Sequence, residues 1–96
     1  MAEYTSLPVS KRLAAAGFNE TSDDRYNDAG TIPTDAYRAD TLLSWLLNHG
    51  DSIEITPDID GFNCTFWVNH HDYNGINIFL CDALAELILN VLEVKA

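Results

Sequence analysis

The spacing of apolar residues changes along this chain, and the change limits the folds it can adopt. Apolar residues recur at every third or fourth position in 6–18, 37–49 and 80–94, whereas in 51–79 they recur at every second position. The first spacing gathers apolar side chains on one face of a helix, and the second gathers them on one face of a strand. We therefore expect an α+β fold in which two to three helices pack on one face of a small antiparallel sheet.

The helical segments carry signals for where they begin and end. Ser6 can accept a hydrogen bond from a free backbone N–H at the start of the first helix, and Pro8 follows where its missing donor costs little. Gly17 and Gly50 follow the first two helices, and we expect each to adopt the left-handed conformation that ends a helix. The apolar face of the last helix is Leu80, Leu84, Leu87, Ile88, Val91 and Leu92. Its polar face is Asp82, Glu86, Asn90 and Glu93.

The central segment predicts two strands and a short third one. A turn signal at 57–61 joins the first two strands as an antiparallel pair. The dipeptide Asn74-Gly75 predicts a second hairpin turn, which leaves 76–79 as the third strand. The residues that we expect to face the core are Ile53, Ile55, Phe62, Cys64, Phe66 and Val68.

The length of 96 residues is typical of a single domain with one modest core, so we treat 1–96 as one domain. We expect 37–95 to form a helix–sheet–helix core and 1–5 to be flexible. The polar segment 19–36 predicts a long loop, in which a short strand around 25–27 or 31–32 is an open alternative.

Charge is the feature that most restricts function. The chain has 15 acidic residues and 5 Lys or Arg, for a formal net charge of −10. No Lys or Arg occurs from Ala39 to Val94, whereas nine carboxylates do. Such a surface repels nucleic acid and anionic lipid and attracts basic protein surfaces. We expect a protein partner with a basic surface, and no direct contact with nucleic acid or membrane.

The signals for catalysis and for metal binding are weak. Adjacent His70 and His71 on a strand would point to opposite faces, so we expect them not to share a metal ion, and we predict no metal and no cofactor.

Without a signal peptide or an apolar run of roughly 20 residues, we expect a cytoplasmic protein with reduced, buried cysteines. Cys64 falls on the apolar strand face, whereas Cys81 opens the last helix, where the helix dipole lowers a thiol pKa.

Two aromatic side chains accompany the carboxylates of the sheet region. Trp67 is on the strand face opposite to Phe66 and near Tyr73, and it is exposed if helices cover only the other face. The alternative is that the first helix or the loop at 19–36 covers Trp67. The predicted protein-binding residues are Asp51, Glu54, Asp58, Asp60, Trp67, Asp72 and Tyr73.

Three motifs resemble a set of short phage and prophage proteins. They are LPVSKRLAAAGF at 7–18, YRADTLLSWL at 37–46 and DALAELILNVL at 82–92. Proteins of that set have a "SKRLKELGF" opening, a "TADELLEWL" helix, a small sheet and a closing "LADALAxLLxWL" helix. This chain departs from them in 19–36, where an aromatic strand is expected, and at Arg38, which replaces a capping threonine. The resemblance implies an accessory gene of a mobile element and assigns no activity and no site residues.

These observations favour a non-enzymatic phage or prophage accessory protein that binds a host or phage protein. One form of this function is inhibition of nucleic-acid-binding defence machinery by mimicry, of the anti-CRISPR or anti-restriction type, in which carboxylates occupy a groove built for phosphates. The alternatives are a structural protein that self-associates as a homodimer and a small metal-dependent or thiol enzyme.

Overall fold

A computed structural model describes residues 4–26 and 34–95. The elements are α1 (Leu7–Ala15), β1 (Asp24–Tyr26), β2 (Thr34–Ala36), α2 (Ala39–His49), β3 (Ser52–Asp58), β4 (Gly61–Val68), β5 (His71–Asn77) and α3 (Leu80–Lys95). Strands β1 and β2 form a two-stranded sheet, and β3, β4 and β5 form a three-stranded sheet in that order, with antiparallel pairing throughout. The predicted α+β fold is confirmed, with the small β1–β2 sheet as an addition.

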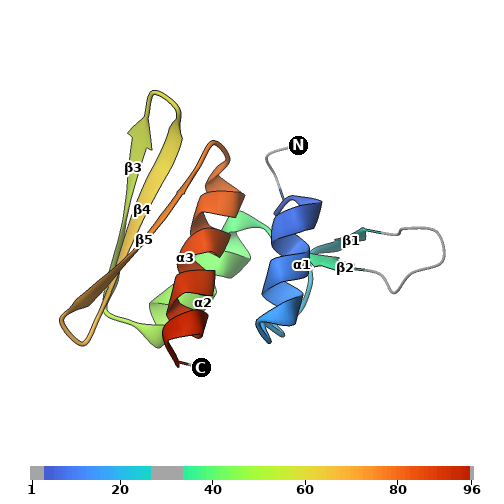
Figure 1. Cartoon of the computed structure of the whole chain (residues 1–96), viewed down its shortest axis with the longest axis horizontal. Coiled ribbons are helices and arrows are strands. Elements are labelled where there is room, and N and C mark those ends of the chain that lie inside the picture. Colours follow the sequence, from blue (N-terminus) through green and yellow to red (C-terminus); the bar gives the residue numbers. More distant parts are fainter. Residues whose placement is uncertain (1–3, 27–33, 96) are drawn as a thin grey trace.

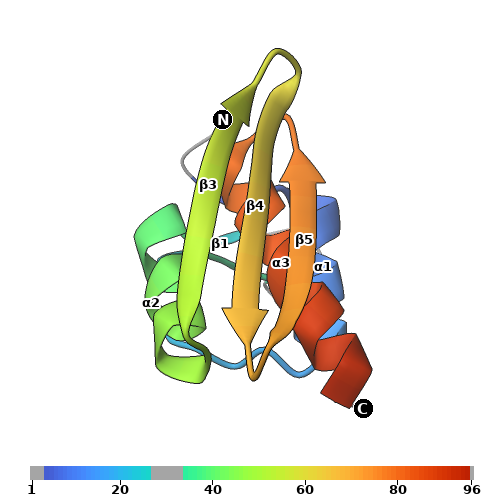
Figure 2. The same ribbon diagram turned by 90° about the vertical axis from the view of Figure 1, so that its left-hand side faces the viewer.

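The elements lie in three layers (Figure 1). The three-stranded sheet is the first layer, α2 and α3 cover one of its faces, and α1 with the β1–β2 hairpin lies on the far side of α3. Figure 2 looks onto the other face of the sheet, in front of which no described helix lies. The prediction that helices pack on one face of the sheet is therefore correct, although α1 packs mainly on α3 and β2.

Helix α3 is buried around most of its circumference because it lies between the sheet, α2 and α1. In addition to its predicted apolar face, Cys81, Ala85 and Leu89 are at most 2% exposed. Asp82 was predicted on the polar face, but it is only 4% exposed. A helix that is apolar on nearly all sides is typical of a position at the centre of a fold.

The inner face of the sheet agrees with the predicted alternation. Cys64 and Phe66 of β4 are fully buried. They are the cross-strand partners of Ile55 and Ile53 of β3, which pack on the same core. Because β4 is the central strand, its alternate residues supply most of the sheet's contribution to the core.

The second hairpin turn is not where the sequence predicted it. The turn between β4 and β5 is Asn69-His70, with φ angles of 50° and 69°, as the favoured two-residue hairpin turn requires. Strand β5 runs straight through Asn74-Gly75. A Cβ atom on Gly75 would lie 2.2 Å from the carbonyl oxygen of Ala83, so this glycine allows α3 to pack against β5. The predicted third strand at 76–79 is correspondingly wrong in its bounds.

Two of the predicted helix-end signals act differently in the structure. Ser6 is the N-cap residue of α1, but its side chain makes no capping hydrogen bond. Gly50 has a φ of −158°, which is extended backbone and not the left-handed conformation. A Cβ atom on Gly50 would lie 2.1 Å from a ring carbon of Phe66, so close packing is the reason for glycine here. Gly17 has the expected positive φ, at 90°.

The segment 19–36 is not a single loop, because it contains β1 and β2. Strand β1 lies close to the strand considered at 25–27, whereas the alternative at 31–32 lies outside the described residues. Of the segment 1–5, predicted to be flexible, only residues 4 and 5 are described. Thr5 is fully buried, and its backbone N–H donates a hydrogen bond of 2.9 Å to the carbonyl of Tyr37. Thr5 is therefore held against the core of the fold.

Candidate functional site

The face of the sheet that no described helix covers is the main candidate for a functional surface (Figure 2). The inward-facing residues of the strands pack on the core, so the alternate residues point to the other side. We call this set of outward-facing residues the open face. It comprises Ser52, Glu54, Thr56 and Asp58 of β3, Asn63, Thr65 and Trp67 of β4, and Asp72, Asn74 and Ile76 of β5.

Carboxylates of the two outer strands lie on either side of Trp67. Its direct cross-strand partners are Ser52 of β3 and Asp72 of β5. Glu54 is the diagonal neighbour of Trp67, at a separation of roughly 7–8 Å between backbones, which long side chains can bridge. Asp58 lies at the opposite end of β3. The open face therefore carries one large aromatic side chain and three carboxylates.

The structure also decides what covers Trp67. Helix α1 and the β1–β2 hairpin are separated from the sheet by α3, so neither can reach the open face (Figures 1 and 2). The Trp67 side chain is half-buried by its neighbours within the sheet. The sequence left open whether Trp67 is exposed or is covered by the first helix or by 19–36. Cover by the first helix or by the described part of 19–36 is wrong.

The predicted binding residues do not all lie together. Glu54, Asp58, Trp67 and Asp72 share the open face. Tyr73 does not, because it is the cross-strand partner of Phe66 and packs against the core. The expectation that Tyr73 accompanies Trp67 is therefore wrong, since adjacent residues of a strand point to opposite faces.

Asp51 and Asp60 lie at opposite ends of the sheet. The Asp51 carboxylate accepts a hydrogen bond of 3.2 Å from the backbone N–H of Asn69, so it braces the β4–β5 turn. Asp60 is exposed in the β3–β4 turn, next to Ile59. These two carboxylates border the open face at its two ends and are not part of its centre.

Exposed apolar side chains at the β3–β4 turn and at the end of β5 were not predicted. A Cβ atom on Gly61 would lie 2.5 Å from the Cα of Ile78, which shows that the turn and the end of β5 are neighbours. Ile59, at the tip of this turn, is 97% exposed. Ile76, Ile78 and Phe79, in and after β5, are also exposed. An isoleucine between the turn residues of 57–61 was the one sequence signal for this feature.

The open face has no positive charge of its own. Within the described residues, all ion pairs are made by arginines that precede residue 39: Arg12 with Glu86, Arg25 with Asp35, and Arg38 with Asp40. None of these pairs involves a residue of the open face. Its carboxylates therefore face solvent without a neutralising partner among the described side chains, and their field is directed outward.

Both cysteines are buried thiols. Burial raises the pKa of Cys64 to about 11. Burial is also the largest of the effects that raise the pKa of Cys81, and it outweighs the lowering by a backbone hydrogen bond from Ala39. The net change in the Cys81 pKa is therefore upward, whereas the position at the start of the last helix had suggested a lowered pKa. Across the described ranges, no three His, Cys, Asp or Glu side chains are grouped so as to hold a metal ion.

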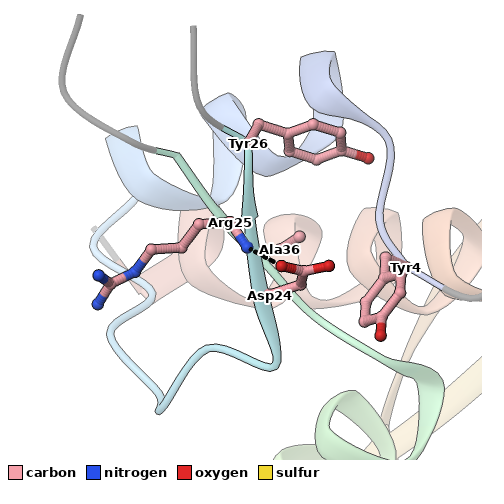
Figure 3. A pocket seen from close by; sticks show the side chains of 5 residues that line it. All are labelled: Tyr4, Asp24, Arg25, Tyr26 and Ala36. Atoms are coloured by element: carbon pink, nitrogen blue, oxygen red, sulfur yellow. Dashed lines mark hydrogen bonds between the residues drawn. The ribbon is translucent and has the colours of Figure 1, made fainter.

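A separate hollow of about 210 Å³ lies at the β1–β2 hairpin, on the side of the molecule away from the open face. It is lined by Tyr4, Asp24, Arg25, Tyr26 and Ala36 (Figure 3).

No described helix is long and apolar enough to cross a membrane.

Comparison of the chain with protein families, with curated proteins and with solved structures finds no match. The functional interpretation therefore rests on the geometry and the charge of the open face and the hollow, together with the resemblance of the three sequence motifs.

Proposed function

We propose that this chain is a non-enzymatic accessory protein that binds a basic surface of a partner protein through the open face of its sheet. The observation that carries the proposal is Trp67, which lies on an uncovered sheet face between strands that bear Glu54 and Asp72. An antiparallel sheet commonly leaves one face in solvent, so the uncovered face alone does not indicate binding. A large aromatic residue on that face, with carboxylates on both neighbouring strands, is typical of a binding surface.

The charge of this surface indicates the kind of partner. Between Ala39 and Val94 there is no Lys or Arg, so the charges of the open-face carboxylates add up to a negative electrostatic potential that extends into solvent. Such a field accelerates association with a basic surface and disfavours acidic partners. Trp67 would then contribute most of the short-range affinity, since tryptophan is enriched among the residues that dominate binding energies.

The resemblance to short phage and prophage proteins suggests where this partner is found. In that setting we propose a cytoplasmic partner from nucleic-acid-binding defence machinery, whose basic groove is built for phosphates. The carboxylates on an ordered sheet would occupy that groove and compete with the nucleic acid. This is mimicry of anti-CRISPR or anti-restriction type.

The two alternative functions have less support. Self-association through the open face would bring Glu54, Asp58 and Asp72 of two copies together, and such like-charge contact is unfavourable. A thiol enzyme needs an accessible thiolate, whereas Cys64 is fully buried and its pKa is raised to about 11.

The test uses a partner that is first captured from host cells with the full chain as bait and then purified. We expect its affinity for this chain to fall steeply as salt is raised from about 50 to 500 mM, because exposed charges are screened over that range. Nucleic acid bound by the partner should be displaced by this chain. Affinity that does not change with salt, or binding that leaves the nucleic acid in place, contradicts mimicry.

Matched variants locate the contact. We expect Trp67→Ala and the double variant Glu54→Gln/Asp72→Asn each to weaken binding about tenfold or more, as for residues at the centre of an interface. Glu20→Gln is the control, because Glu20 is an exposed carboxylate outside the sheet. Equal affinities of the open-face variants and the control would exclude the open face as the binding surface.

A further inference from the structure

The hollow at the β1–β2 hairpin is formed by side chains that strand geometry places on one side. Asp24 and Tyr26 are two residues apart in β1 and point to the same face, and Ala36 is the cross-strand partner of Asp24. Ala36 is buried and its small side chain leaves space. Tyr4, from the segment that precedes α1, completes the lining (Figure 3).

The same alternation removes the positive charge from this hollow. Arg25 lies between Asp24 and Tyr26, so its side chain points to the opposite face of the hairpin, as Figure 3 shows. There its Nε donates a hydrogen bond of 3.1 Å to Asp35, which is its cross-strand partner. Arg25 therefore borders the hollow, but its guanidinium group is turned away and is paired with a carboxylate.

The walls of the hollow are held in place by hydrogen bonds. The Tyr26 hydroxyl donates a bond of 2.7 Å to the backbone carbonyl of Thr5, which is itself buried. One oxygen of the Asp24 carboxylate accepts a bond of 2.8 Å from the backbone N–H of Arg25, and the other remains on the side of the hollow. A site whose side chains are already fixed loses less entropy when a ligand binds.

Negative charge gathers around this hollow. Burial raises the pKa of the Tyr26 phenol, and the negative charges of Asp82 and then Asp24 raise it further. The phenol therefore stays neutral at physiological pH. Two aromatic rings and a carboxylate, with no described cation pointing inward, form the combination that attracts organic cations.

We propose that this hollow binds a primary ammonium group carried on a short alkyl stem. The ammonium would contact the Asp24 carboxylate, and the stem would lie between the rings of Tyr4 and Tyr26 over Ala36. A volume of about 210 Å³ is too small for most cofactors but suits a group of this size. The ammonium belongs either to a free amine or to a lysine side chain of another protein.

The first experiment compares n-butylammonium with 1-butanol, its neutral analogue, by amide chemical shifts of the full chain. We expect n-butylammonium to shift the amide signals of residues 4, 24–26 and 36, and 1-butanol to leave them in place. Equal shifts with both compounds would identify a plain apolar hollow and overturn the proposal, as would no shift with either.

Substitutions then test the two contacts separately. Asp24→Asn keeps the shape of the side chain and removes its charge, and Tyr4→Leu removes an aromatic ring without breaking a hydrogen bond that holds the hairpin. We expect each to weaken n-butylammonium binding by roughly two- to fivefold, the size of partly exposed charge and ring contacts. Asp58→Asn, with the same loss of charge on the open face, should bind as the native chain does. An unchanged affinity in Asp24→Asn, with the fold intact by circular dichroism, overturns the proposal.

A blocked Gly-Gly-Lys-Gly-Gly peptide distinguishes the two sources of the ammonium. Tighter binding of the peptide than of n-butylammonium indicates a lysine of another protein, and equal or weaker binding indicates a free amine. The hollow lies on the opposite side of α3 from the open face, so open-face variants should bind n-butylammonium normally. The outcome is therefore independent of the proposed function.

Discussion

The Asp82 carboxylate accepts a hydrogen bond of 2.8 Å from the backbone N–H of Ser6, 76 positions earlier in the chain. Asp82 is in the first turn of α3, and Ser6 is the N-cap residue of α1. This bond ties the starts of two helices together. It also explains how a carboxylate can be nearly buried, since a hydrogen bond and the positive end of a helix dipole both offset its lost hydration.

Loss of this bond should destabilise the protein. We expect Asp82→Ala to lower the free energy of unfolding by about 1–3 kcal/mol, because the Ser6 N–H is left without its acceptor. Urea denaturation measures the change. Glu86→Gln is the matched control on the same helix, since it only weakens the partly exposed pair with Arg12, a change of less than about 1 kcal/mol. A cost for Asp82→Ala no larger than that of the control would contradict the structural role of this bond.

Gly75 is required for the contact between β5 and α3. In Gly75→Ala, the added Cβ would meet the backbone of Ala83 and Leu87, which cannot move aside as a flexible side chain can. We expect a loss of about 1–3 kcal/mol in the free energy of unfolding, the usual cost of overpacking. Asn74→Ala, one residue away on the open face, should cost less than Gly75→Ala. The reverse ranking would indicate that these residues form a turn after all.

Neighbouring residues of β4 should differ sharply in their effect on stability. Phe66 is fully buried, and we expect Phe66→Ala to cost about 3–5 kcal/mol. Trp67 is half-buried on the open face, so Trp67→Ala should cost clearly less. Chemical denaturation of the two variants checks this difference. Equal costs would mean that the open face is covered in solution, for example by a second copy of the chain.

Stability should fall at alkaline pH because of Cys64. Burial raises its pKa from an ordinary value of 9.0 to about 11, so the folded state holds its proton more tightly than the unfolded state. The thiol is protonated in both states below pH 9, and stability is then lost as pH rises from 9.0 to about 11. Two pKa units correspond to about 3 kcal/mol as an upper bound.

The measurement compares urea denaturation at several pH values for the native chain and for Cys64→Ala. The variant is less stable below pH 9.0 because it lacks the buried thiol, and it should lose less stability between pH 9.0 and about 11 than the native chain does. Tyr26, Tyr37 and Cys81 also have raised pKa values and remain in the variant, so the difference between the two curves isolates Cys64. Identical pH dependence in the two proteins would contradict this assignment.

The sequence predicted most of the elements because local spacing is a direct consequence of burying one face. The three helices, the first two strands of the main sheet and the inward positions of Cys64 and Phe66 all follow from that spacing. The absence of Lys and Arg from the sheet region is likewise evident from the sequence alone. Four of the predicted binding residues, Glu54, Asp58, Trp67 and Asp72, share the open face because they obey the same alternation.

Contacts between distant segments decided the rest. Asn74-Gly75 has the composition of a hairpin turn, but its glycine serves the approach of α3, which local sequence cannot reveal. The burial of Asp82 depends on Ser6, and the hollow at Tyr4, Asp24 and Tyr26 depends on a hairpin lying beside the start of the chain. The local spacing of apolar residues indicates that one face of an element is buried. It does not indicate which segment covers that face, because this depends on packing between elements far apart in the chain. For this reason, only the tertiary structure shows that one face of the sheet is uncovered and that Trp67 lies on it.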